Sequence, residues 1–310
     1  MTFDKRQLSK EAKTINFVRD TYEKVIRLIE ILRMIQENEP FCTCLALKGG
    51  TAINLTVFDL PRLSVDIDLD YDGSDEKDIV MEKRSLMNKA LITYMEKEGY
   101  EFSPKSKEHY ALDSYVFSYV NAGGQKDNIK LDINYSLRTH LLPTTFRKIR
   151  VIPCGNLYVK TLHPVEIFAG KTNALFTRCM PRDMYDYYQM IQMGLFDENE
   201  KELLRKCSVF YKAVSAKDDD YAFYIDKIND VRQVDIKRYL FPVIHQSEFV
   251  DVKKMQDVIM NFYQKYLQLD KQDTAFLENF KKGEYLPQLL FSNEIAKRIE
   301  NHPMIQWKLK

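Results

Sequence analysis

Ser64–Tyr71, which reads SVDIDLDY, decides the fold because it alternates strictly between apolar and mostly acidic residues. Side chains of a β-strand point to opposite faces in turn, so the stretch predicts a strand with one buried apolar face. Asp66 and Asp68 then share the other face, with Cα atoms about 6–7 Å apart. Such a pair suits Mg²⁺, which takes few carboxylates and completes its shell with water and substrate phosphates. We interpret Asp70, near the strand end, as solvated.

A second stretch, Asn128–Tyr135, alternates in the same way and predicts another strand. Its polar face carries Lys130 and Asp132. If this strand lies beside the first, Asp132 becomes a third carboxylate at the same centre. Two divalent ions held there would stabilise the attacking and leaving oxygens of a phosphoryl displacement. Asp132 could also accept the proton of the attacking hydroxyl, and Lys130 could offset phosphate charge.

A glycine turn precedes the acidic strand, in the order Lys48, Gly49, Gly50, Thr51. Two glycines allow the backbone to approach a ligand closely, and the helix expected after them offers free amide donors. A triphosphate tail would fit there, and Thr51 would cap the helix or bind a phosphate oxygen. The turn is not a Walker A loop, because GxxxxGK[ST] is absent.

The chain divides by character near His163-Pro164. Residues 1–163 read as an α/β domain with N-terminal helices, and residues 164–310 read as helical, so we expect an α+β fold. The helix at 165–179 must touch the first domain if its polar residues serve the same site. Expected helices cover residues 1–40, 51–58, 76–98, 165–179, 182–194, 198–215, 251–269 and 293–301, and expected strands cover 44–47, 64–71, 113–121, 128–135, 147–152 and 157–162.

Composition points to a globular protein. The 310 residues are 45% hydrophobic and 29% charged, with a net charge of +1. No apolar run approaches the ~20 residues that cross a bilayer, and the N-terminus lacks the apolar core of a signal peptide. Five cysteines without a CxxC spacing read as reduced thiols, so we expect a cytoplasmic protein.

The acidic strand alone is weak evidence, because carboxylates on an exposed strand face are usually only solvated. A lone Gly-Gly turn is weaker still. Their combination with a second strand carrying Asp132 is stronger, since three carboxylates facing together would repel one another without a cation. The scattered histidines indicate neither a zinc site nor a histidine-activated nucleophile.

Three segments together resemble a known family. Lys48–Leu55 with Arg62–Leu69 is similar to the first motif of the AbiEii/AbiGii toxin family of nucleotidyltransferases. Lys130–Asn134 is similar to its second motif. Pro164–Leu175, followed by Arg178 and Arg182-Asp183-Met184-Tyr185-Asp186, resembles its third. The resemblance spans roughly residues 45–190.

The resemblance implies a DNA polymerase β-like nucleotidyltransferase fold, with a mixed sheet flanked by helices, followed by an all-helical domain. It implies that the acidic strand binds metal and nucleotide, and that the third-motif lysine and final aspartate, here Lys171 and Asp186, are needed for activity. Family members act as toxins of two-gene toxin–antitoxin or phage-defence systems, and some add nucleotides to the 3′ end of tRNA. The expected catalytic residues are Asp66, Asp68, Asp132, Lys171 and Asp186, with the first three as metal ligands; the expected nucleotide-binding residues are Lys48, Gly49, Gly50, Thr51, Arg62, Ser64, Lys130 and Arg178.

The third segment has an ordinary interpretation beside the functional one. On a continuous helix Lys171, Arg178 and Asp186 would share one stripe, but Pro181 predicts a break into two helices. Lys171 and Arg178 could bind phosphates while Asp186 orients Lys171 or helps to place the substrate. In the ordinary interpretation Lys171 and Arg178 are solvated, and Arg182-Asp183 is a charge pair at a helix start. Glu166 fits a first-turn acid that suits the helix dipole. For Arg62, a phosphate contact and a structural pair with an aspartate are about equally expected.

The leading hypothesis is a Mg²⁺- or Mn²⁺-dependent toxin that transfers NMP from an NTP to an RNA acceptor, namely tRNA. We expect a cognate antitoxin encoded nearby and no membrane partner. A second hypothesis keeps the chemistry but modifies a protein hydroxyl or a small molecule, which the near-neutral charge slightly favours. A basic run, Arg147-Lys148-Ile149-Arg150, is the feature that speaks for RNA. A third hypothesis is a non-catalytic nucleotide-binding module, which the full set of carboxylates disfavours.

Overall fold

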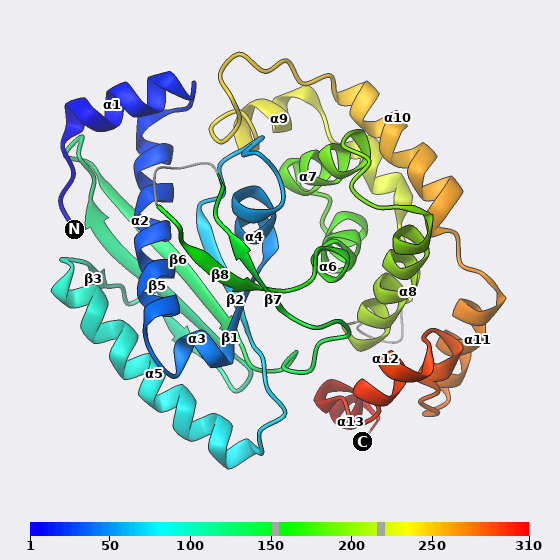
Figure 1. Ribbon diagram of the computed structural model, residues 1–310. Coiled ribbons are helices and arrows are strands. Elements are labelled where there is room, and N and C mark those ends of the chain that lie inside the picture. Colours follow the sequence, from blue (N-terminus) through cyan, green and yellow to red (C-terminus); the bar gives the residue numbers. More distant parts are fainter. Residues whose placement is uncertain (151–154, 216–220, 310) are drawn as a thin grey trace. The chain divides into compact units, whose positions relative to one another are not determined.

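The computed structural model describes residues 1–150, 155–215 and 221–309, which fall into two compact units (Figure 1). The first unit comprises residues 1–138, 144–162 and 243–247. The second comprises residues 139–143, 163–242 and 248–310. The main division therefore lies at residues 162 and 163, and two short segments join the unit on the other side of it.

The first unit consists of helices around one mixed sheet. Its helices are α1 (Lys5–Thr14), α2 (Arg19–Glu37), α3 (Phe41–Cys44), α4 (Gly49–Thr56) and α5 (Lys77–Lys97). Its strands are β1 (Leu45–Lys48), β2 (Asp66–Tyr71), β3 (Glu101–Phe102), β4 (Lys107–Glu108), β5 (Leu112–Val120), β6 (Lys126–Asn134), β7 (Thr145–Lys148) and β8 (Tyr158–Thr161). The strand order is β3-β5-β6-β2-β1-β8-β7, with β4 paired to β5.

The two alternating strands lie side by side at the centre of this sheet. β2 is parallel to β6 and antiparallel to β1, whereas β5 and β6 form an antiparallel hairpin. Along β2, Ile67 and Leu69 are almost fully buried, and their neighbours Leu131 and Ile133 on β6 are buried with them. The period-two alternation of both strands thus assigns one apolar and one polar face to the sheet centre, as predicted.

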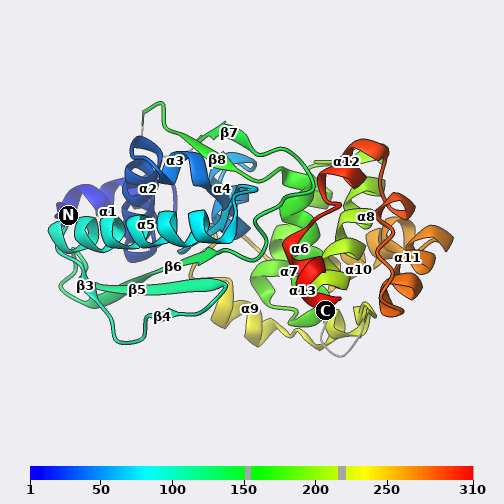
Figure 2. The same cartoon turned by 90° about the horizontal axis from the view of Figure 1, so that it is seen from below.

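Helix α5 covers the apolar face. Asp113 of β5 lies opposite Ile133 of β6 and therefore points to the apolar side. Its buried carboxylate accepts hydrogen bonds from Arg84 Nε at 2.9 Å and Asn88 Nδ2 at 2.9 Å, both on α5. Figure 2 shows α2 and α5 on the same side of the sheet. Within this unit, the face that carries Asp66 and Asp68 is the one opposite these two helices.

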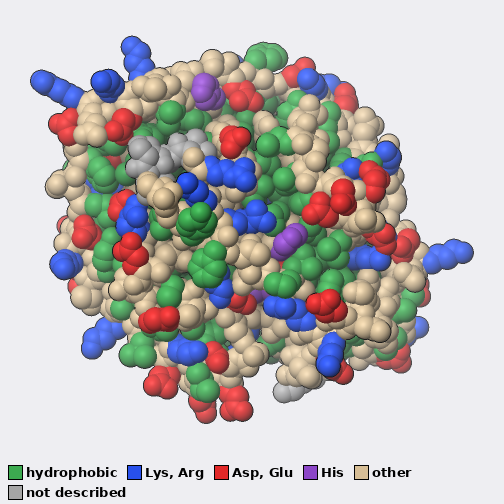
Figure 3. All heavy atoms as spheres, in the orientation of Figure 1, with side chains coloured by type: hydrophobic (Ala, Val, Ile, Leu, Met, Phe, Trp, Pro, Cys, Tyr) green, Lys and Arg blue, Asp and Glu red, His purple; other side chains and the backbone are tan. Residues whose placement is uncertain are grey.

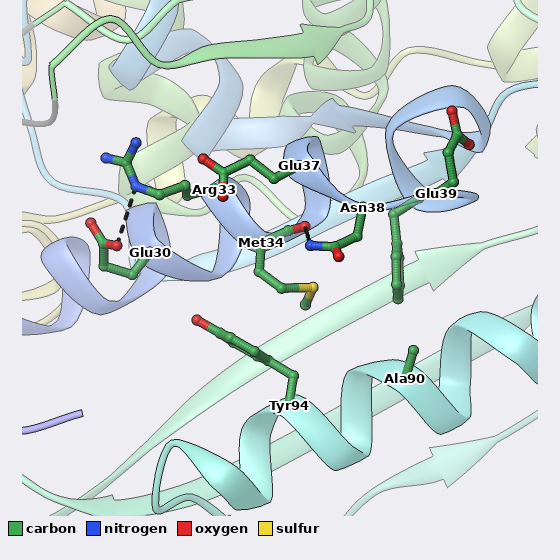
Figure 4. A pocket seen from close by; sticks show the side chains of 9 residues that line it. Glu30, Arg33, Met34, Glu37, Asn38, Glu39, Ala90 and Tyr94 are labelled. Carbon is green, nitrogen blue, oxygen red and sulfur yellow. Dashed lines mark hydrogen bonds and ion pairs between the residues drawn. The ribbon is translucent and has the colours of Figure 1, made fainter.

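A cavity of about 320 Å³ lies on the helical side of the first unit (Figure 4). It opens between the end of α2, α3 and α5, where Glu30 pairs with Arg33 at its rim. Its lining contains none of the acidic residues of β2 or β6. The lining residues are Glu30, Arg33, Met34, Glu37, Asn38, Glu39, Phe41, Ala90 and Tyr94.

The second unit is helical in its described residues. Its α-helices are α6 (Pro164–Thr177), α7 (Pro181–Gln192), α8 (Glu198–Ser215), α9 (Gln233–Tyr239), α10 (Val252–Phe262), α11 (Lys271–Lys281), α12 (Asn293–Arg298) and α13 (Pro303–Lys308); shorter helical turns are η1 (Ile225–Asp230), η2 (Tyr263–Leu267) and η3 (Pro287–Leu289). Prolines occupy the first position of α6, α7 and α13, where their missing N–H costs nothing. None of the described helices is both long and apolar enough to cross a bilayer.

The predicted α+β class is confirmed, and most predicted elements are present within a few residues. α4 begins at Gly49 rather than Thr51, and α9, α11 and α13 were not predicted. The predicted strand pair at 147–152 and 157–162 corresponds to β7 and β8, although residues 151 and 152 lie outside the described residues. Cys154 lies outside them as well, and the other four cysteines are free thiols.

Candidate functional site

The polar face of the sheet brings Asp68 and Asp132 together. In the parallel pair β2–β6, Asp66 aligns with Lys130, and Asp68 aligns with Asp132. Neighbouring strands lie about 4.8 Å apart, so the aligned carboxylates are direct neighbours on one face. The two alternating strands therefore lie side by side, which was the condition for Asp132 to join the acidic pair.

Asp68 is held in an environment that disfavours its charge. Burial raises the pKa of this carboxyl above its ordinary value, and the negative charges of Asp66 and Asp132 act in the same direction. Lys48, aligned with Asp68 across the antiparallel pair β1–β2, acts against them. A carboxylate crowded by two others gains most from a bound cation, because the cation removes the repulsion that raises its pKa.

Asp132 has two partners that fix its carboxylate. Ser114 Oγ, on β5, donates to one oxygen at 2.6 Å, and the Lys130 ammonium donates to the other. Burial opposes the charge of Lys130, but the hydrogen bond to Asp132 and the nearby aspartates outweigh it and raise the lysine pKa. Lys130 is 45% exposed, so its charge remains open to a ligand.

The Gly49-Gly50 turn packs directly against this acidic cluster. Gly49 has φ +68°, and a Cβ there would lie 2.5 Å from Asp68 Oδ2. A Cβ at Gly50 would lie 2.7 Å from the Arg62 guanidinium and 3.0 Å from Ser64 Oγ. A side chain at Gly49 would displace the Asp68 carboxylate, and one at Gly50 would displace the Arg62 guanidinium; Gly49 is also favoured by its left-handed backbone. The first amides of α4 thus begin beside Asp68.

Thr51 and Arg62 are buried and tie the turn to the acidic strand. Thr51 Oγ1 contacts Ser64 Oγ at 3.0 Å and donates to the carbonyl of Asp66. The helix N-cap is Lys48, so the expectation that Thr51 caps α4 is wrong. Arg62 donates to the carbonyl of Leu63 at 2.9 Å, and its backbone forms a bridge with Ile244. These contacts hold the loop before β2 in place.

Asp70 is not solvated, contrary to our interpretation of the sequence. It is 2% exposed and forms an ion pair with Lys48, whose Nζ lies 2.5 Å away. The sequence pattern did contain the signal, because Asp70 falls on the same face as Asp66 and Asp68. What it lacked was the antiparallel partner β1, which brings a lysine to that face.

The donor set of this face fits a hard divalent cation. In the described residues, no three His, Cys, Asp or Glu side chains come together in a ready-made metal cage. Mg²⁺ does not require one, because it is usually bound through one or two carboxylates, water and substrate phosphates. The adjacent pair Asp68 and Asp132, with Asp66 on the same face, supplies that number. Asp132 accepts hydrogen bonds from one ammonium and one hydroxyl, which orient its carboxylate on this face.

The second unit holds a buried ion pair between two helices. Lys171 of α6 places its ammonium 2.6 Å from Asp186 Oδ2 and 3.7 Å from Asp183 Oδ1, both on α7. Asp186 is fully buried and Lys171 is 7% exposed. Lys171 is therefore not solvated, and its pairing with Asp186 leaves the orienting role of Asp186 as a prediction.

Pro181 separates α6 from α7, as predicted. Arg178, which lies between the two helices, contacts Asp183. Its guanidinium donates two hydrogen bonds to the Asp183 carboxylate, at 2.8 and 3.1 Å, while 64% of the side chain stays exposed. Arg182 instead donates to the carbonyl of Tyr239 at 2.9 Å. In the ordinary interpretation of the sequence, Asp183 would form a helix-start charge pair with Arg182. Asp183 instead accepts two hydrogen bonds from Arg178 and forms a longer ion pair with Lys171.

Glu166 is more than a first-turn acid. It is 2% exposed and accepts hydrogen bonds from the backbone amides of Leu141 and Leu142, each at 3.0 Å. Tyr211 also donates to it, and His140 lies 3.5 Å away. Burial opposes its charge, but His140 and these donors outweigh burial and lower the pKa of Glu166. Glu166 therefore anchors the segment 139–143, a role that helix position alone could not indicate.

Comparisons with known proteins identify a family and a similar fold. The family model described as "Nucleotidyl transferase AbiEii toxin, Type IV TA system" matches residues 31–268. Among solved structures, MenT4, a nucleotidyltransferase toxin from Mycobacterium tuberculosis H37Rv, matches with a TM-score of 0.66 and 15% identity over 99% of each chain. No curated protein sequence matches significantly.

Proposed function

The chain belongs to the AbiEii family of nucleotidyltransferase toxins of type IV toxin–antitoxin systems, and from this membership we propose that it transfers NMP from an NTP to the 3′ end of an RNA, namely tRNA. The observation that carries the proposal is the register of β2 and β6. It sets Asp68 beside Asp132, with the glycine turn against Asp68.

The first amides of α4 and the charge of Lys130 are the groups that would bind the triphosphate. Backbone N–H groups at a helix N-terminus favour phosphate oxygens, and the glycines allow the close approach that this requires. Asp66, Asp68 and Asp132 would hold Mg²⁺ or Mn²⁺, which supplies neutralisation of phosphate charge when bound. Lys48 would add positive charge beside the same face.

We assign Asp132 as the group that accepts the proton of the attacking hydroxyl. The acceptor hydroxyl oxygen attacks the α-phosphorus, the bond from that phosphorus to the β-phosphate oxygen breaks, and pyrophosphate leaves. The hydroxyl proton passes to the Asp132 carboxylate, whose orientation Ser114 and Lys130 maintain. Positioning and charge neutralisation provide most of the rate enhancement in such transfers.

Lys171, Asp186 and Arg178 enter the proposal through their resemblance to the third family motif. Burying a lysine beside two carboxylates is costly, and such an arrangement suits a functional lysine. We propose that Lys171 is needed for transfer and that Asp186 positions it. Arg178, largely exposed, would contact phosphate.

The proposal is tested by incubating the protein with Mg²⁺, each α-labelled NTP, and total RNA with cell lysate. We expect label in tRNA. Asp68→Asn should abolish labelling, and Asp59→Asn, a change at an 81% exposed side chain, should leave it unchanged. Label in protein would replace the RNA acceptor by a protein hydroxyl. Nucleotide binding without any label would support a non-catalytic module. Labelling that survives Asp68→Asn would show that the site is wrong.

A type IV toxin has a cognate antitoxin, and we propose that it is a protein that acts without forming a stable complex. Co-purification of the two proteins would contradict this part of the proposal and leave the enzymatic part intact.

A further inference from the structure

The hairpin formed by β7 and β8 exposes two aromatic rings. Phe146 on β7 is 61% exposed and Tyr158 on β8 is 52% exposed. Aromatic rings bury large apolar areas when they pack, so two exposed rings on one short hairpin indicate an unfilled contact. Figure 3 shows hydrophobic side chains at the surface over this hairpin, together with lysine and arginine side chains.

The strand register places both rings on one face. Phe146 lies opposite Lys160, and Lys148 lies opposite Tyr158. Directly opposed residues of an antiparallel pair share a face, and diagonal neighbours lie about 7–8 Å apart. The two rings are therefore diagonal neighbours, with the exposed Lys148 beside them. Lys160 lies on the same face, but its ammonium forms an ion pair with Asp72 at 2.7 Å.

This aromatic face continues the face of the acidic cluster. Thr161 of β8 pairs with Leu47 of β1, so both point to the apolar side of the sheet. Lys160, one residue earlier, points to the opposite side, and Phe146 points there with it. That opposite side is the face of Lys48 and Asp68. The carboxylates at the sheet centre and the two rings near its edge thus lie on the same side of the sheet, with the buried Ala46 between them.

The spacing along this face matches a short run of nucleotides. β7 lies three strands from β2 in the order β2-β1-β8-β7, which is about 14 Å at about 4.8 Å per strand. Stacked nucleotides rise about 3.4 Å each, so about four of them cover that span. A terminal hydroxyl at Asp68 would then leave the preceding bases over the hairpin.

The charge of the hairpin also suits RNA. Residues 144–162 contain four lysines and arginines and no aspartate or glutamate. Bases stack on exposed aromatic rings regardless of sequence, while nearby cations bind the phosphates. We propose that the β7–β8 hairpin binds the unpaired terminal nucleotides of the acceptor RNA, with bases stacked on Phe146 and Tyr158 and phosphate contacted by Lys148. This inference rests on the proposed function for its acceptor.

The test is binding of a short fluorescein-labelled single-stranded oligoribonucleotide, measured by fluorescence anisotropy without NTP. Loss of one stacking ring should weaken binding about five- to tenfold, and Phe146→Ala with Tyr158→Ala together at least about thirtyfold. Tyr158→Phe, which retains the ring, should bind within about twofold of the unchanged protein. Lys148→Gln should reduce the salt dependence of binding by about one phosphate contact.

Tyr110→Ala is the matched control, because Tyr110 is 76% exposed and precedes β5, near the other edge of the same sheet. It should leave RNA binding unchanged. The inference is overturned if the double variant binds within twofold of the unchanged protein, if Tyr110→Ala weakens binding equally, or if the oligoribonucleotide does not bind at all. A protein that binds RNA through the two rings but labels no RNA would overturn the proposed function and not this surface.

Discussion

The ammonium group of Lys48 lies 2.5 Å from the carboxylate of Asp70, whose side chain is 2% exposed. Lys48 precedes the glycine turn, and Asp70 lies on the acidic strand two residues beyond Asp68. The pair therefore joins the glycine turn to the strand that carries the carboxylates, on the polar face of the sheet.

The two halves of this pair should respond unequally to substitution. Lys48→Met leaves a buried carboxylate without its cation and should cost about 3 kcal/mol of unfolding free energy. Asp70→Asn leaves only a lysine that is a quarter exposed, so it should cost about 1 kcal/mol. Urea unfolding measures both. The double variant should cost less than the sum; equal costs for the two single variants would contradict the buried pair.

Gly49→Ala should inactivate the protein because the new Cβ would displace the Asp68 carboxylate. Misplacement of a reacting group by about 1 Å can cost about 100-fold in rate, so we expect at least that loss of nucleotide transfer. Gly99→Ala is the control, since Gly99 has φ +84° but open space around its Cβ position. Both variants should lose about 1–2 kcal/mol to the left-handed backbone, and Gly99→Ala should keep its activity. Similar activities in the two variants would refute the role of the close approach.

Substitutions of Lys171 and Asp186 should change the free energy of unfolding and the labelling activity in different ways. Lys171→Met leaves Asp186 buried and unpaired, at a cost of about 3–5 kcal/mol. Asp186→Asn should cost less, because Asp183 remains 3.7 Å from the lysine. Each change should reduce RNA labelling at least about 100-fold if Lys171 stabilises charge in transfer. The double variant should regain part of the stability and none of the activity; recovered labelling would show that the pair is only structural.

Stability should fall as the pH drops from about 6.5 to about 4, because of His302. This imidazole is fully buried, and burial, with His140 nearby, lowers its pKa from 6.5 to about 4. In that window the unfolded chain binds a proton that the folded chain does not, so acid favours unfolding. The contribution approaches about 3 kcal/mol at the low end. Urea unfolding as a function of pH should show this slope reduced in His302→Asn, whose side chain can still cap α13; an unchanged slope would contradict it.

The local patterns of the sequence were enough to predict the acidic strand, its partner β6 and the break at Pro181. Alternation and helix breaking depend on residues close together in the sequence, so a single sequence is enough to predict them. The partners of Asp70, Thr51 and Glu166 were not predictable, since each depends on a backbone segment that folding brings from elsewhere. Glu166, for example, binds amides 24 and 25 residues away, and no period in the sequence encodes that contact. Ser114 lay on a predicted strand, but only the register with β6 makes it a partner of Asp132.

The segment 243–247 has a consequence for synthesis of the protein. The first unit includes it, and it pairs with the loop before the acidic strand through Leu63 N to the Val243 carbonyl and the bridge from Arg62 to Ile244. A ribosome adding about 5–20 residues per second needs about 4–16 s to travel from residue 162 to residue 243. During that interval the strand with the carboxylates has already been synthesised. The loop before it still lacks its backbone contacts with Val243 and Ile244. A translation product that stops before residue 243 never forms these contacts. We therefore expect an incomplete copy of this toxin to have a poorly held loop before its acidic strand.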